Sequence, residues 1–436
     1  MRSTPGGSRA CPVSGADIGI ASRAEKTRDE RRDRVITRSC VSFRPTITSM
    51  PVNDRPRVLF LVEGFTDIRF VVGLSEICDL AMIVPARAYR ESHLIDRVAE
   101  SGASVRVIEV PGGRLRFQAD SLRALWRQTR DCDVILSQEL LRGSLNANLI
   151  ARLRGKPVVV YMGISPLEYF RCRRERGEIG ATASWLGSTA IRTMAAVNGR
   201  LSTRCLAMGP YLRDVAARWC ARTEIGLYYG VDVDRFRPAD ADERTRLRRH
   251  LGLPEEGFLV VLSSRISHEK DPETVLRAVA IARSRGLNAR LLNLGGGYRE
   301  FLALPASLGI TDSTSWVLAR PAVHPIKDLA DYLRSADAVA LASLAEGAAY
   351  STLEALACGT PVVATAVGGM AAQLPGYAAL VPRRDARAMA DALLTIASDP
   401  TRARAQALMG REYVRRDWSR EKAFGDLARV LVSVSN

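Results

Sequence analysis

The sequence predicts an α/β protein made of two doubly wound parallel sheets in tandem. Short apolar runs rich in β-branched residues recur along the chain, with helix-length segments between them. This alternation occurs twice, and a stretch rich in Gly, Pro and charge separates the two series. Uninterrupted apolar runs of this length are typical of strands buried on both faces, as in a parallel sheet covered by helices.

The first series defines a predicted domain over 53–226, and the second defines a domain over 227–415. The runs of the first are VLFLVEG (58–64), AMIVPA (81–86), VRVIEV (105–110), DVILSQ (133–138) and PVVVYMG (157–163). Those of the second are FLVVLSSR (258–265), ARLLNLGGG (289–297), AVALASL (338–344), PVVATAVGG (361–369) and AALVP (378–382). Each half is predicted to be Rossmann-like, and such sheets bind ligands outside the carboxyl ends of their strands. Two of them facing each other would form an interdomain cleft for two substrates.

Residues 1–52 stand apart from both series. They are rich in Arg, Ser, Gly, Thr and Pro and show no sustained periodicity. Such a segment cannot bury enough apolar surface to offset its ordering entropy, so a disordered basic tail is predicted. An alternative is that residues 1–49 are not translated, because Met50 lies just before the first apolar run. The acidic residues of the segment argue against a transit peptide.

Length and composition fit two soluble domains. A chain of 436 residues exceeds one ordinary core, and 47% hydrophobic with 25% charged residues is typical of globular proteins. No apolar run reaches the roughly 18–20 residues of a membrane-spanning helix. The eight cysteines form no CxxC pair, which indicates reduced thiols and a cytoplasmic protein, not a disulfide framework or zinc site.

The net charge of +16 has three interpretations. The first is Arg-rich coding bias with no polyanionic partner. Attraction to an anionic membrane surface ranks second. Nucleic acid ranks last, because no RNP signature, zinc-finger spacing or basic-aromatic strand pattern accompanies the charge, so no nucleic-acid partner is predicted.

The segment from Glu346 to Glu354 carries the clearest chemistry. An apolar run ends in a turn at Glu346, and Tyr350 to Ala357 is predicted to be helical. Free backbone amides at a helix start suit a phosphate, and a carboxylate accepts paired hydrogen bonds from vicinal hydroxyls of a sugar. The amides in question are those of Gly347, Ala348 and Ala349. The alternative is that both glutamates are ordinary cap and surface residues.

A second motif, SSRISHEKDPETVLRA (263–278), places two cations on a strand-to-helix loop. Arg265 and Lys270 could clamp a diphosphate and stabilise charge on a leaving nucleotide. The alternative is a solvated loop with ordinary surface charges.

These two stretches resemble a known family. EGAAYSTLEALACGTPVVATAVGG is similar to the Glu-x7-Glu signature of the retaining family 4 glycosyltransferases (glycosyltransferase group 1), which have the GT-B architecture. The resemblance implies that Glu346 contacts the donor sugar and Glu354 the ribose of the nucleotide. It also implies that Gly347, Ala348 and Ala349 bring amides to the diphosphate, which Arg265 and Lys270 bind.

Further segments between about 225 and 400 support the resemblance. YYGVDVDRFRP (228–238) is similar to the family's NGVDxxRFxP linker, with Tyr229 in place of the common Asn. NLGGGYREF (293–301) resembles a turn near the nucleotide, which implies a donor-binding role for Gly295 and Gly296. The resemblance also implies that Arg320 lies beside the base, and that 416–436 form a closing helix that crosses back to the first domain.

The family's acceptor binds to the first domain, where the resemblance is loose. The candidate acceptor-side residues are Gly64, Met162 and Gly163. Met162 occupies the place of a histidine that many relatives carry after the fifth strand, so that histidine's role is not transferred here.

No metal is predicted. Three DxD patterns occur, at 131–133, 232–234 and 240–242. The first precedes a strand and the other two lie in the linker, whereas a metal-binding DxD must end a strand and face the donor. Arg265, Lys270 and backbone amides are expected to replace a metal, so no cofactor is required.

The predicted function is retaining transfer of a sugar, a hexose in particular, from a nucleotide-diphosphate sugar to a hydroxyl acceptor. The acceptor could be lipid-linked or a cell-surface polysaccharide precursor. The basic stretch RCRRERGEIG (171–180) and the amphipathic segment that follows fit peripheral attachment to the inner face of a membrane. The alternatives are a nucleotide-sugar epimerase or hydrolase of the same architecture, and a catalytically silent nucleotide-sugar-binding protein.

Overall fold

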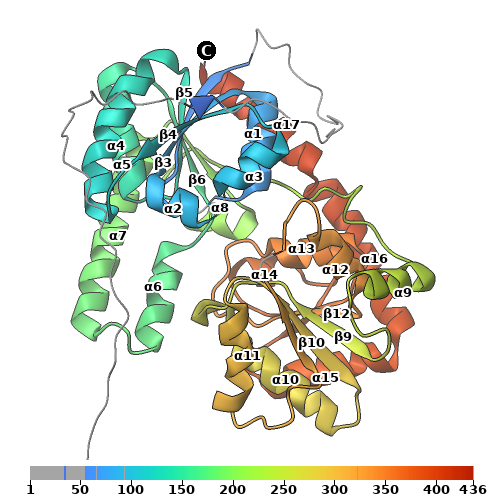
Figure 1. Ribbon diagram of the computed structural model, residues 1–436. Helices are drawn as coiled ribbons and strands as arrows, with labels where there is room; N and C mark the ends of the chain where they lie inside the picture. The colour runs from blue at the N-terminus through green and yellow to red at the C-terminus, as the bar shows by residue number, and fades with distance from the viewer. Residues whose placement is uncertain (1–33, 36–54, 65, 93, 322, 436) are drawn as a thin grey trace, which may run out of the picture. The chain divides into compact units, whose positions relative to one another are not determined.

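Two parallel sheets form the framework of the protein (Figure 1). The computed structural model describes residues 34–35, 55–64, 66–92, 94–321 and 323–435. The predicted tail over 1–52 and the alternative start at Met50 therefore lie outside the described residues, apart from Arg34 and Val35. These two residues form a short strand.

The first sheet has the order β1-β4-β3-β2-β5-β6-β7-β8. All neighbours pair in parallel except β1, which is antiparallel to β4. The strands are β1 (Arg34–Val35), β2 (Arg57–Leu61), β3 (Asp79–Pro85), β4 (Val105–Val110), β5 (Val134–Gln138), β6 (Val158–Met162), β7 (Arg204–Ala207) and β8 (Thr223–Ile225). The chain changes direction across the sheet between β2 and β5, which lie side by side.

The second sheet has the order β11-β10-β9-β12-β13-β14 and is parallel throughout. Its strands are β9 (Phe258–Leu262), β10 (Ala289–Leu294), β11 (Val317–Arg320), β12 (Ala338–Leu341), β13 (Val362–Thr365) and β14 (Ala379–Val381). Here the change of direction falls between β9 and β12. Ligands of open α/β sheets bind at such a point, beyond the carboxyl ends of the strands.

Helices cover both faces of each sheet (Figure 1). Those of the first half are α1 (Ile68–Ile77), α2 (Ala86–Glu91), α3 (Leu94–Ser101), α4 (Arg114–Gln128), η2 (Thr129–Asp131), α5 (Arg142–Arg154), α6 (Pro166–Glu175), α7 (Ala181–Leu201) and α8 (Pro210–Ala216). Those of the second half are α9 (Ala241–His250), η3 (His268–Lys270), α10 (Pro272–Ser284), α11 (Tyr298–Ser307), α12 (Leu329–Ser335), α13 (Tyr350–Ala357), α14 (Gly368–Gln373), α15 (Ala386–Ser398), α16 (Pro400–Asp417) and α17 (Arg420–Ser435). None of the described helices is long and apolar enough to cross a membrane.

The predicted fold class, two doubly wound α/β sheets, is confirmed. Every predicted apolar run contains a strand. Eight of these ten strands end one to four residues before the run does, because the remaining residues begin the loop at the carboxyl end. Strands β1 and β11 lie outside the ten predicted runs, β1 within the segment predicted to be disordered. Strands β7 and β8 were not predicted either. They have four and three residues, include Arg204 and Glu224, and lie at one edge of the sheet, so they lack the long apolar run of a central strand.

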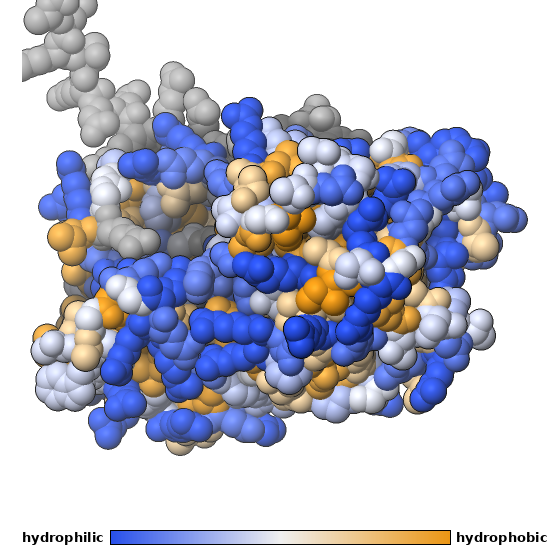
Figure 2. All heavy atoms as spheres, turned by 90° about the horizontal axis from the view of Figure 1, so that it is seen from below, coloured by the Kyte–Doolittle hydropathy of each residue, from blue (hydrophilic) through white to orange (hydrophobic). Residues whose placement is uncertain are grey.

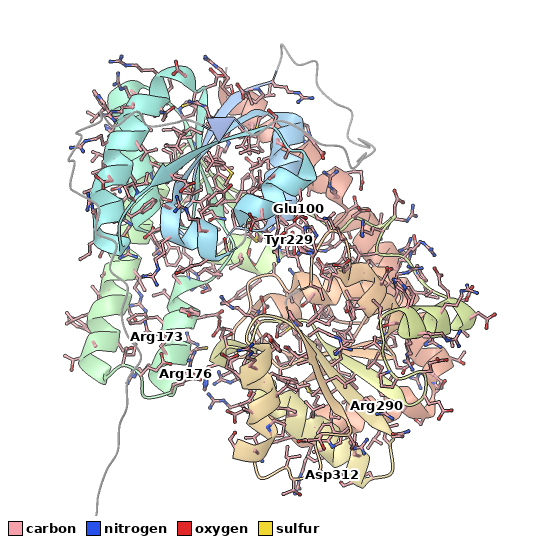
Figure 3. The ribbon with its side chains drawn as sticks, viewed as in Figure 1. Glu100, Arg173, Arg176, Tyr229, Arg290 and Asp312 are labelled. Atoms are coloured by element: carbon pink, nitrogen blue, oxygen red, sulfur yellow. The ribbon has the colours of Figure 1, made fainter. Side chains whose placement is uncertain are left out.

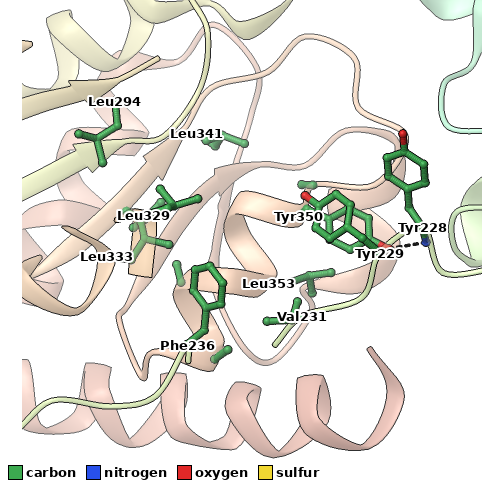
Figure 4. Close-up of a cluster of buried hydrophobic side chains, with 14 of the residues drawn as sticks. Tyr228, Tyr229, Val231, Phe236, Leu294, Leu329, Leu333, Leu341, Tyr350 and Leu353 are labelled. Atoms are coloured by element: carbon green, nitrogen blue, oxygen red, sulfur yellow. Dashed lines mark hydrogen bonds between the residues drawn. The ribbon is translucent and has the colours of Figure 1, made fainter. Parts of the chain in front are cut away.

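A band of aromatic side chains joins the cores of the two halves. Tyr228 and Tyr229 belong to the chain between the sheets and pack against Phe70 of α1 and Tyr350 of α13 respectively (Figure 4). The Tyr350 hydroxyl accepts a hydrogen bond from the backbone amide of Tyr228 at 2.8 Å. The buried apolar cluster therefore continues from one sheet to the other.

The last helix returns to the first half of the chain. Ser419 forms a bridge with Val231, and Phe424 of α17 is fully buried against Phe70 and Gly73 of α1. The described residues from Arg34 onward form one compact unit, so no break within them marks the predicted limit between the two domains. Those limits stay predictions.

Candidate functional site

The candidate site lies at the carboxyl ends of β9 and β12, which are adjacent strands of the second sheet. The loop after β9 leads into η3 and carries Arg265 and Lys270. The loop after β12 leads into α13 and carries Glu346. Both loops start at the point where the strand order reverses, which is where this type of sheet binds ligands.

Lys270 and Glu346 meet across these two loops. The Lys270 ammonium donates to Glu346 Oε2 at 2.5 Å, and the Ser343 hydroxyl donates to the same oxygen at 3.2 Å. Lys270 is held in place because the next residue, Asp271, adopts φ 44° and caps α10 through the backbone amide and the hydroxyl of Thr274. The structure therefore brings together two of the three residues predicted to be catalytic.

Arg265 points away from this pair. Its side chain is 63% exposed and donates to Glu269 Oε1 at 2.7 Å. Arg176, which follows α6 in the first half, lies 3.6 Å from the other oxygen of Glu269 (Figure 3). Burial opposes ionisation of Glu269, but hydrogen bonds from its own backbone and from Ser267 and the charge of Arg265 outweigh it and lower its pKa. The anionic partner of Arg265 in this structure is therefore Glu269.

Backbone atoms of two neighbouring segments pack closely against the loop at Glu346 and Gly347. An ideal Cβ on Gly347 would lie 2.4 Å from the carbonyl oxygen of Gly163, at the end of β6 in the first sheet. On the other side, Gly369 would place a Cβ 2.1 Å from the Gly347 carbonyl, and its amide donates to the Glu346 carbonyl at 2.8 Å. Gly368, with φ 45°, is equally tight against Glu346. These four glycines let three segments meet without side chains between them.

Ala348 and Ala349 connect this loop to α13. Ala349 is buried and precedes the first residue of the helix, Tyr350, whose amide donates to the Ala348 carbonyl. The Ala349 carbonyl accepts from the amide and the hydroxyl of Thr352. Residues 347–349 therefore lie before α13, as the sequence predicts, next to the Lys270–Glu346 pair.

Glu354 occupies a different environment from Glu346. It lies inside α13 with 2% of its side chain exposed and is paired with Arg69 of α1. The Tyr229 hydroxyl is 3.5 Å from the same oxygen, Oε1. Burial raises the pKa of Glu354, and the positive charge of Arg69 offsets this only in part. Neither Arg69 nor the interaction with Tyr229 was predicted from the sequence.

Gly295 and Gly296 follow β10, next to the loop that carries Arg265. A Cβ on Gly295 would lie 1.9 Å from the Ser264 carbonyl, and the Gly296 carbonyl accepts from the Ile266 amide at 2.8 Å. Their observed contacts thus fix the Arg265 loop. Arg320 ends the edge strand β11 and donates to the carbonyls of Gly252 and Ala319, away from the pair.

The acceptor-side candidates lie at the carboxyl ends of β2 and β6. Gly64 is exposed and has open space around it. Gly163 contacts Gly347, as described above. The Met162 side chain is 1% exposed and belongs to the core of the first sheet, so it does not face the same space as Gly64.

Glu139 is a further residue at this edge that the sequence did not reveal. It follows β5 with φ 62°, an unfavourable conformation for a residue with a side chain. Its Oε1 accepts from the Gly163 amide at 3.0 Å, and Oε2 is buried with no hydrogen-bond partner in the described residues. Burial raises the pKa of Glu139 to about 8, against the hydrogen bonds from Gly163 and Ile164. The sequence signal that could have identified Glu139 is its position directly after a buried strand of a parallel sheet.

One carboxylate of each DxD pattern has a partner within the protein. Asp133 accepts from the backbone and guanidinium of Arg57. Asp232 accepts from the Arg235 amide, and Asp240 caps α9 through the Glu243 amide. Within the described ranges, no group of three or more His, Cys, Asp or Glu side chains is placed to hold a metal ion. Metal independence stays a prediction.

A cavity of 330 Å³ opens beside Gly368, between α6 and the loops after β12 and β13. Two of its lining residues are cationic, Arg171 and Arg383, and one is acidic, Glu168. Its remaining lining residues are Cys172, Leu344, Ala345, Ala366, Val367 and Gly368. The site therefore adjoins a space lined by both halves of the chain.

Two Rossmann-like parallel sheets in one chain are the architecture of a class of proteins, the GT-B glycosyltransferases. The solved structure of Anabaena Alr3699/HepE in complex with UDP-glucose shares the fold, with a TM-score of 0.69 and 16% identity over 87% of this chain and 100% of that one. At this identity the likeness concerns the fold alone.

Sequence comparison identifies the family. Residues 243–412 match the family described as "Glycosyl transferases group 1". The chain is 32% identical to D-inositol 3-phosphate glycosyltransferase 1 of Catenulispora acidiphila over 347 residues, which span 76% of this chain and 75% of that protein. It is 36% identical to D-inositol 3-phosphate glycosyltransferase of Saccharomonospora viridis over 205 residues, 44% of this chain and 46% of that protein. The chain belongs to the group 1 glycosyltransferases, enzymes that transfer a sugar from a nucleotide sugar.

Proposed function

We propose that the chain transfers a hexose from a nucleotide-diphosphate sugar to a hydroxyl acceptor with retention of the anomeric configuration and without a metal. The observation that carries this is the Lys270–Glu346 pair on adjacent loops of the second sheet, 2.5 Å apart. The similarity of the Glu346–Glu354 segment to the family signature supports the assignment of retention.

In the proposed reaction, the bond between the anomeric carbon and the diphosphate oxygen breaks while the acceptor oxygen bonds to the same face of that carbon. The proton of the acceptor hydroxyl passes to the departing phosphate oxygen. Lys270 and the amides of residues 347–349 stabilise the charge that develops on the diphosphate. Glu346 accepts hydrogen bonds from the donor sugar and Glu354 from the ribose. The chain supplies orientation and charge stabilisation, not a covalent nucleophile.

Arg265 reaches the diphosphate in this proposal only after leaving Glu269. Its exposure and its place on the same loop as Lys270 make this rotation feasible, because the side chain is not enclosed. Glu269 then keeps Arg176 as a cationic neighbour. The Arg265–Glu269 pair is thus a resting arrangement of the loop.

We propose a phosphorylated polyol as the acceptor class. The relatives named above act on D-inositol 3-phosphate according to their names. Arg171 lines the cavity beside Gly368 and suits an anionic group. Arg383 lines the same cavity and is paired with Glu175, from which it would have to turn to contact the acceptor. A lipid-linked sugar remains the second candidate, supported by the basic charge and the exposed apolar residues of α6 and α7.

A donor and acceptor screen tests both parts of the proposal. The purified protein is incubated with a panel of nucleotide sugars and with inositol 3-phosphate, inositol or lipid-linked acceptors, and released nucleotide and product anomers are measured. Transfer with retention, faster for the phosphorylated polyol than for inositol, is the expected result. Release of free or epimerised sugar without an acceptor would support the hydrolase or epimerase alternative. No nucleotide release with any donor would support the silent binding protein.

The two exposed helices α6 and α7 support a proposal of peripheral membrane attachment. Trp185 and Leu186 on α7 are 67% and 57% exposed. Helix α6, which packs against α7, carries the exposed residues Arg171 and Arg174. Arg173 and Arg176 contribute less free charge, because both pair with Glu178. On the face shown in Figure 2, hydrophilic residues predominate and apolar ones form separate patches, so attachment is proposed to depend on charge together with a few apolar side chains.

A further inference from the structure

Glu354 is surrounded by side chains from three separate parts of the chain. Arg69 of α1 is 285 residues away in sequence and donates to Oε1 of Glu354. Tyr229, from the chain between the two sheets, lies 3.5 Å from the same oxygen. Tyr350, one turn earlier on α13, packs against the Tyr229 ring with 4.4 Å between ring centroids. The carboxylate is therefore enclosed by side chains from both halves of the molecule. Figure 4 shows Tyr229 and Tyr350, two of these side chains.

Arg69 is held in one orientation by four further contacts. Its Nε and Nη2 donate to the two oxygens of Asp67 at 2.9 and 2.8 Å, and Nη2 also donates to the Tyr229 hydroxyl at 2.8 Å. The guanidinium lies over the Tyr229 ring at 3.9 Å. Asp67 is itself fixed because it caps α1 by accepting from the Arg69 amide. These contacts already fix the planar guanidinium of Arg69. Its hydrogen bond to Glu354 therefore costs little additional side-chain conformational entropy.

One cation serves two carboxylates in this cluster. Burial opposes ionisation of Asp67, but the charge and hydrogen bonds of Arg69 outweigh it and lower its pKa. Tyr229 and Tyr350, which also face Glu354, have pKa values raised by burial and stay neutral. Without Arg69, Glu354 and Asp67 would be two enclosed carboxylates without their main opposing charge, because Asp67 would keep only the weaker effect of Arg97. Such an arrangement favours protonation.

We propose that Arg69 is a positioning residue for the donor: it holds the Glu354 carboxylate through Oε1, so that Oε2 is presented to the ribose. This inference rests on the proposed role of Glu354 in binding the nucleotide. It goes beyond that role because it makes helix α1, in the acceptor half, a necessary part of nucleotide recognition. Donor affinity then depends on the contact between the two halves of the chain.

Replacement of Arg69 should make donor binding sensitive to pH. Loss of the cation raises the pKa of Glu354 further, so Glu354 takes up a proton as the pH falls through the assay range. The neutral form is the poorer acceptor for a ribose hydroxyl, because hydrogen bonds to a charged group are about twice as strong. In Arg69→Met, the donor KM should therefore rise on acidification and recover at higher pH. In the wild type the donor KM should change less over the same range, because Arg69 offsets part of the effect of burial on Glu354.

The experiment measures kcat and donor KM for the wild type and for R69M, R69K, E354Q and the R69M/E354Q double variant, between about pH 6 and about pH 9. We expect R69M to raise the donor KM by roughly ten- to a hundredfold, the range for a hydrogen bond to a charged group, with a much smaller change in kcat. R69K should show a smaller rise and a flatter pH profile, because lysine keeps the charge but cannot bridge Asp67 and Glu354 with a planar fork. The double variant should lose the pH dependence.

Arg57→Met is the matched control, since Arg57 pairs with Asp133 at the opposite end of β2, away from the site. It should leave the donor KM unchanged. If R69M does not fold, the test relies on R69K alone, and its donor KM at low pH is compared with its donor KM at high pH. An unchanged or lower donor KM in folded R69M or R69K would overturn the inference, and a lower value would mean that Arg69 obstructs Glu354. If E354Q itself leaves the donor KM unchanged, the proposed ribose role fails instead.

Discussion

At the scale of single residues, Lys270 and Glu346 owe their contact to two local backbone features. Asp271 adopts a left-handed backbone conformation, which turns the chain directly after Lys270. The glycines around Glu346 let its loop approach the neighbouring loops with no side chains between them. Both side chains are largely buried, at 21% and 12% exposure, so their charges act in a medium of lower dielectric than water. This is the environment in which a cation stabilises a leaving diphosphate most strongly.

Replacement of Lys270 by Ala should reduce kcat by about 10²–10³-fold, the effect of removing one preorganised group that stabilises transition-state charge. Steady-state kinetics with a saturating donor measures this. Lys422→Ala is a suitable control, because Lys422 pairs with Asp426 on the exposed surface of α17. Full activity of Lys270→Ala would remove the assigned role of this residue.

Gly347 should not tolerate a side chain. A Cβ would lie 2.4 Å from the Gly163 carbonyl, which is backbone and cannot rotate away. We expect Gly347→Ala to lower kcat/KM on the order of a hundredfold by displacing the donor loop. Gly425→Ala on α17, where nothing lies within 4 Å, should leave kcat/KM unchanged. Equal activity of both variants would contradict the close packing at Gly347.

Glu139 should make the free energy of unfolding depend on pH. Its pKa in the folded protein is about 8, raised by burial from an ordinary value of 4.5. A group with a raised folded pKa stabilises the fold below its unfolded pKa, and this contribution is lost as the pH rises through the folded pKa. Stability should therefore fall between pH 4.5 and 8, with a slope approaching about 1.4 kcal/mol per pH unit. Glu139→Gln should show a shallower slope in urea unfolding series across this window, and an unchanged slope would argue against a protonated Glu139.

At the scale of elements, the site is made by loops that leave parallel strands at the same edge. The loops after β9 and β12 carry Lys270 and Glu346, and the loops after β5 and β6 carry Glu139 and Gly163. Parallel strands deliver their following loops to one edge, so residues far apart in the chain converge there. Helix α17 contributes differently, because it packs on α1, the helix that carries Arg69.

Phe424→Ala should destabilise the fold by about 3–5 kcal/mol, since it removes a fully buried aromatic side chain that fills the space beside Gly73. Denaturant unfolding measures the loss. Met409→Ala provides a comparison at an exposed position, with 63% of the side chain accessible, and should have little effect. A near-neutral Phe424→Ala would mean that α17 is not required for the stability of α1.

At the scale of the whole molecule, the net charge of +16 does not consist only of unpaired charges on the surface. Many arginines are paired, and some of these pairs join distant segments, such as Arg420 with Glu76 and Arg383 with Glu175. Part of the excess therefore serves contacts between segments. The unpaired part is what remains to attract an anionic partner.

Liposome flotation tests the proposed membrane attachment. Binding to vesicles with anionic lipid should exceed binding to neutral vesicles and should fall at high salt, because exposed charges are screened. Trp185→Ala combined with Leu186→Ala should weaken it further, whereas Met409→Ala should not. Equal recovery with both vesicle types, or no binding to either, would remove the proposal.

The sequence by itself determined the fold class and the local elements of the donor side. The runs that became β9 and β12, the turn at Glu346 and the helix from Tyr350 to Ala357 are each continuous in sequence, and their apolar periodicity and glycines encode them locally. The strands β7 and β8 were not predicted, because short, partly polar edge strands lack that periodicity.

Only the tertiary structure decided which side chains share a contact. Glu354 is paired with Arg69, Arg265 is turned to Glu269, and Gly163 abuts Gly347. Met162, the last residue of β6, is buried in the core of the first sheet, whereas the next residue, Gly163, contacts the loop after β12. These outcomes depend on how the chain brings loops of two sheets together, and partners separated by up to 285 residues leave no periodic signal in a single sequence.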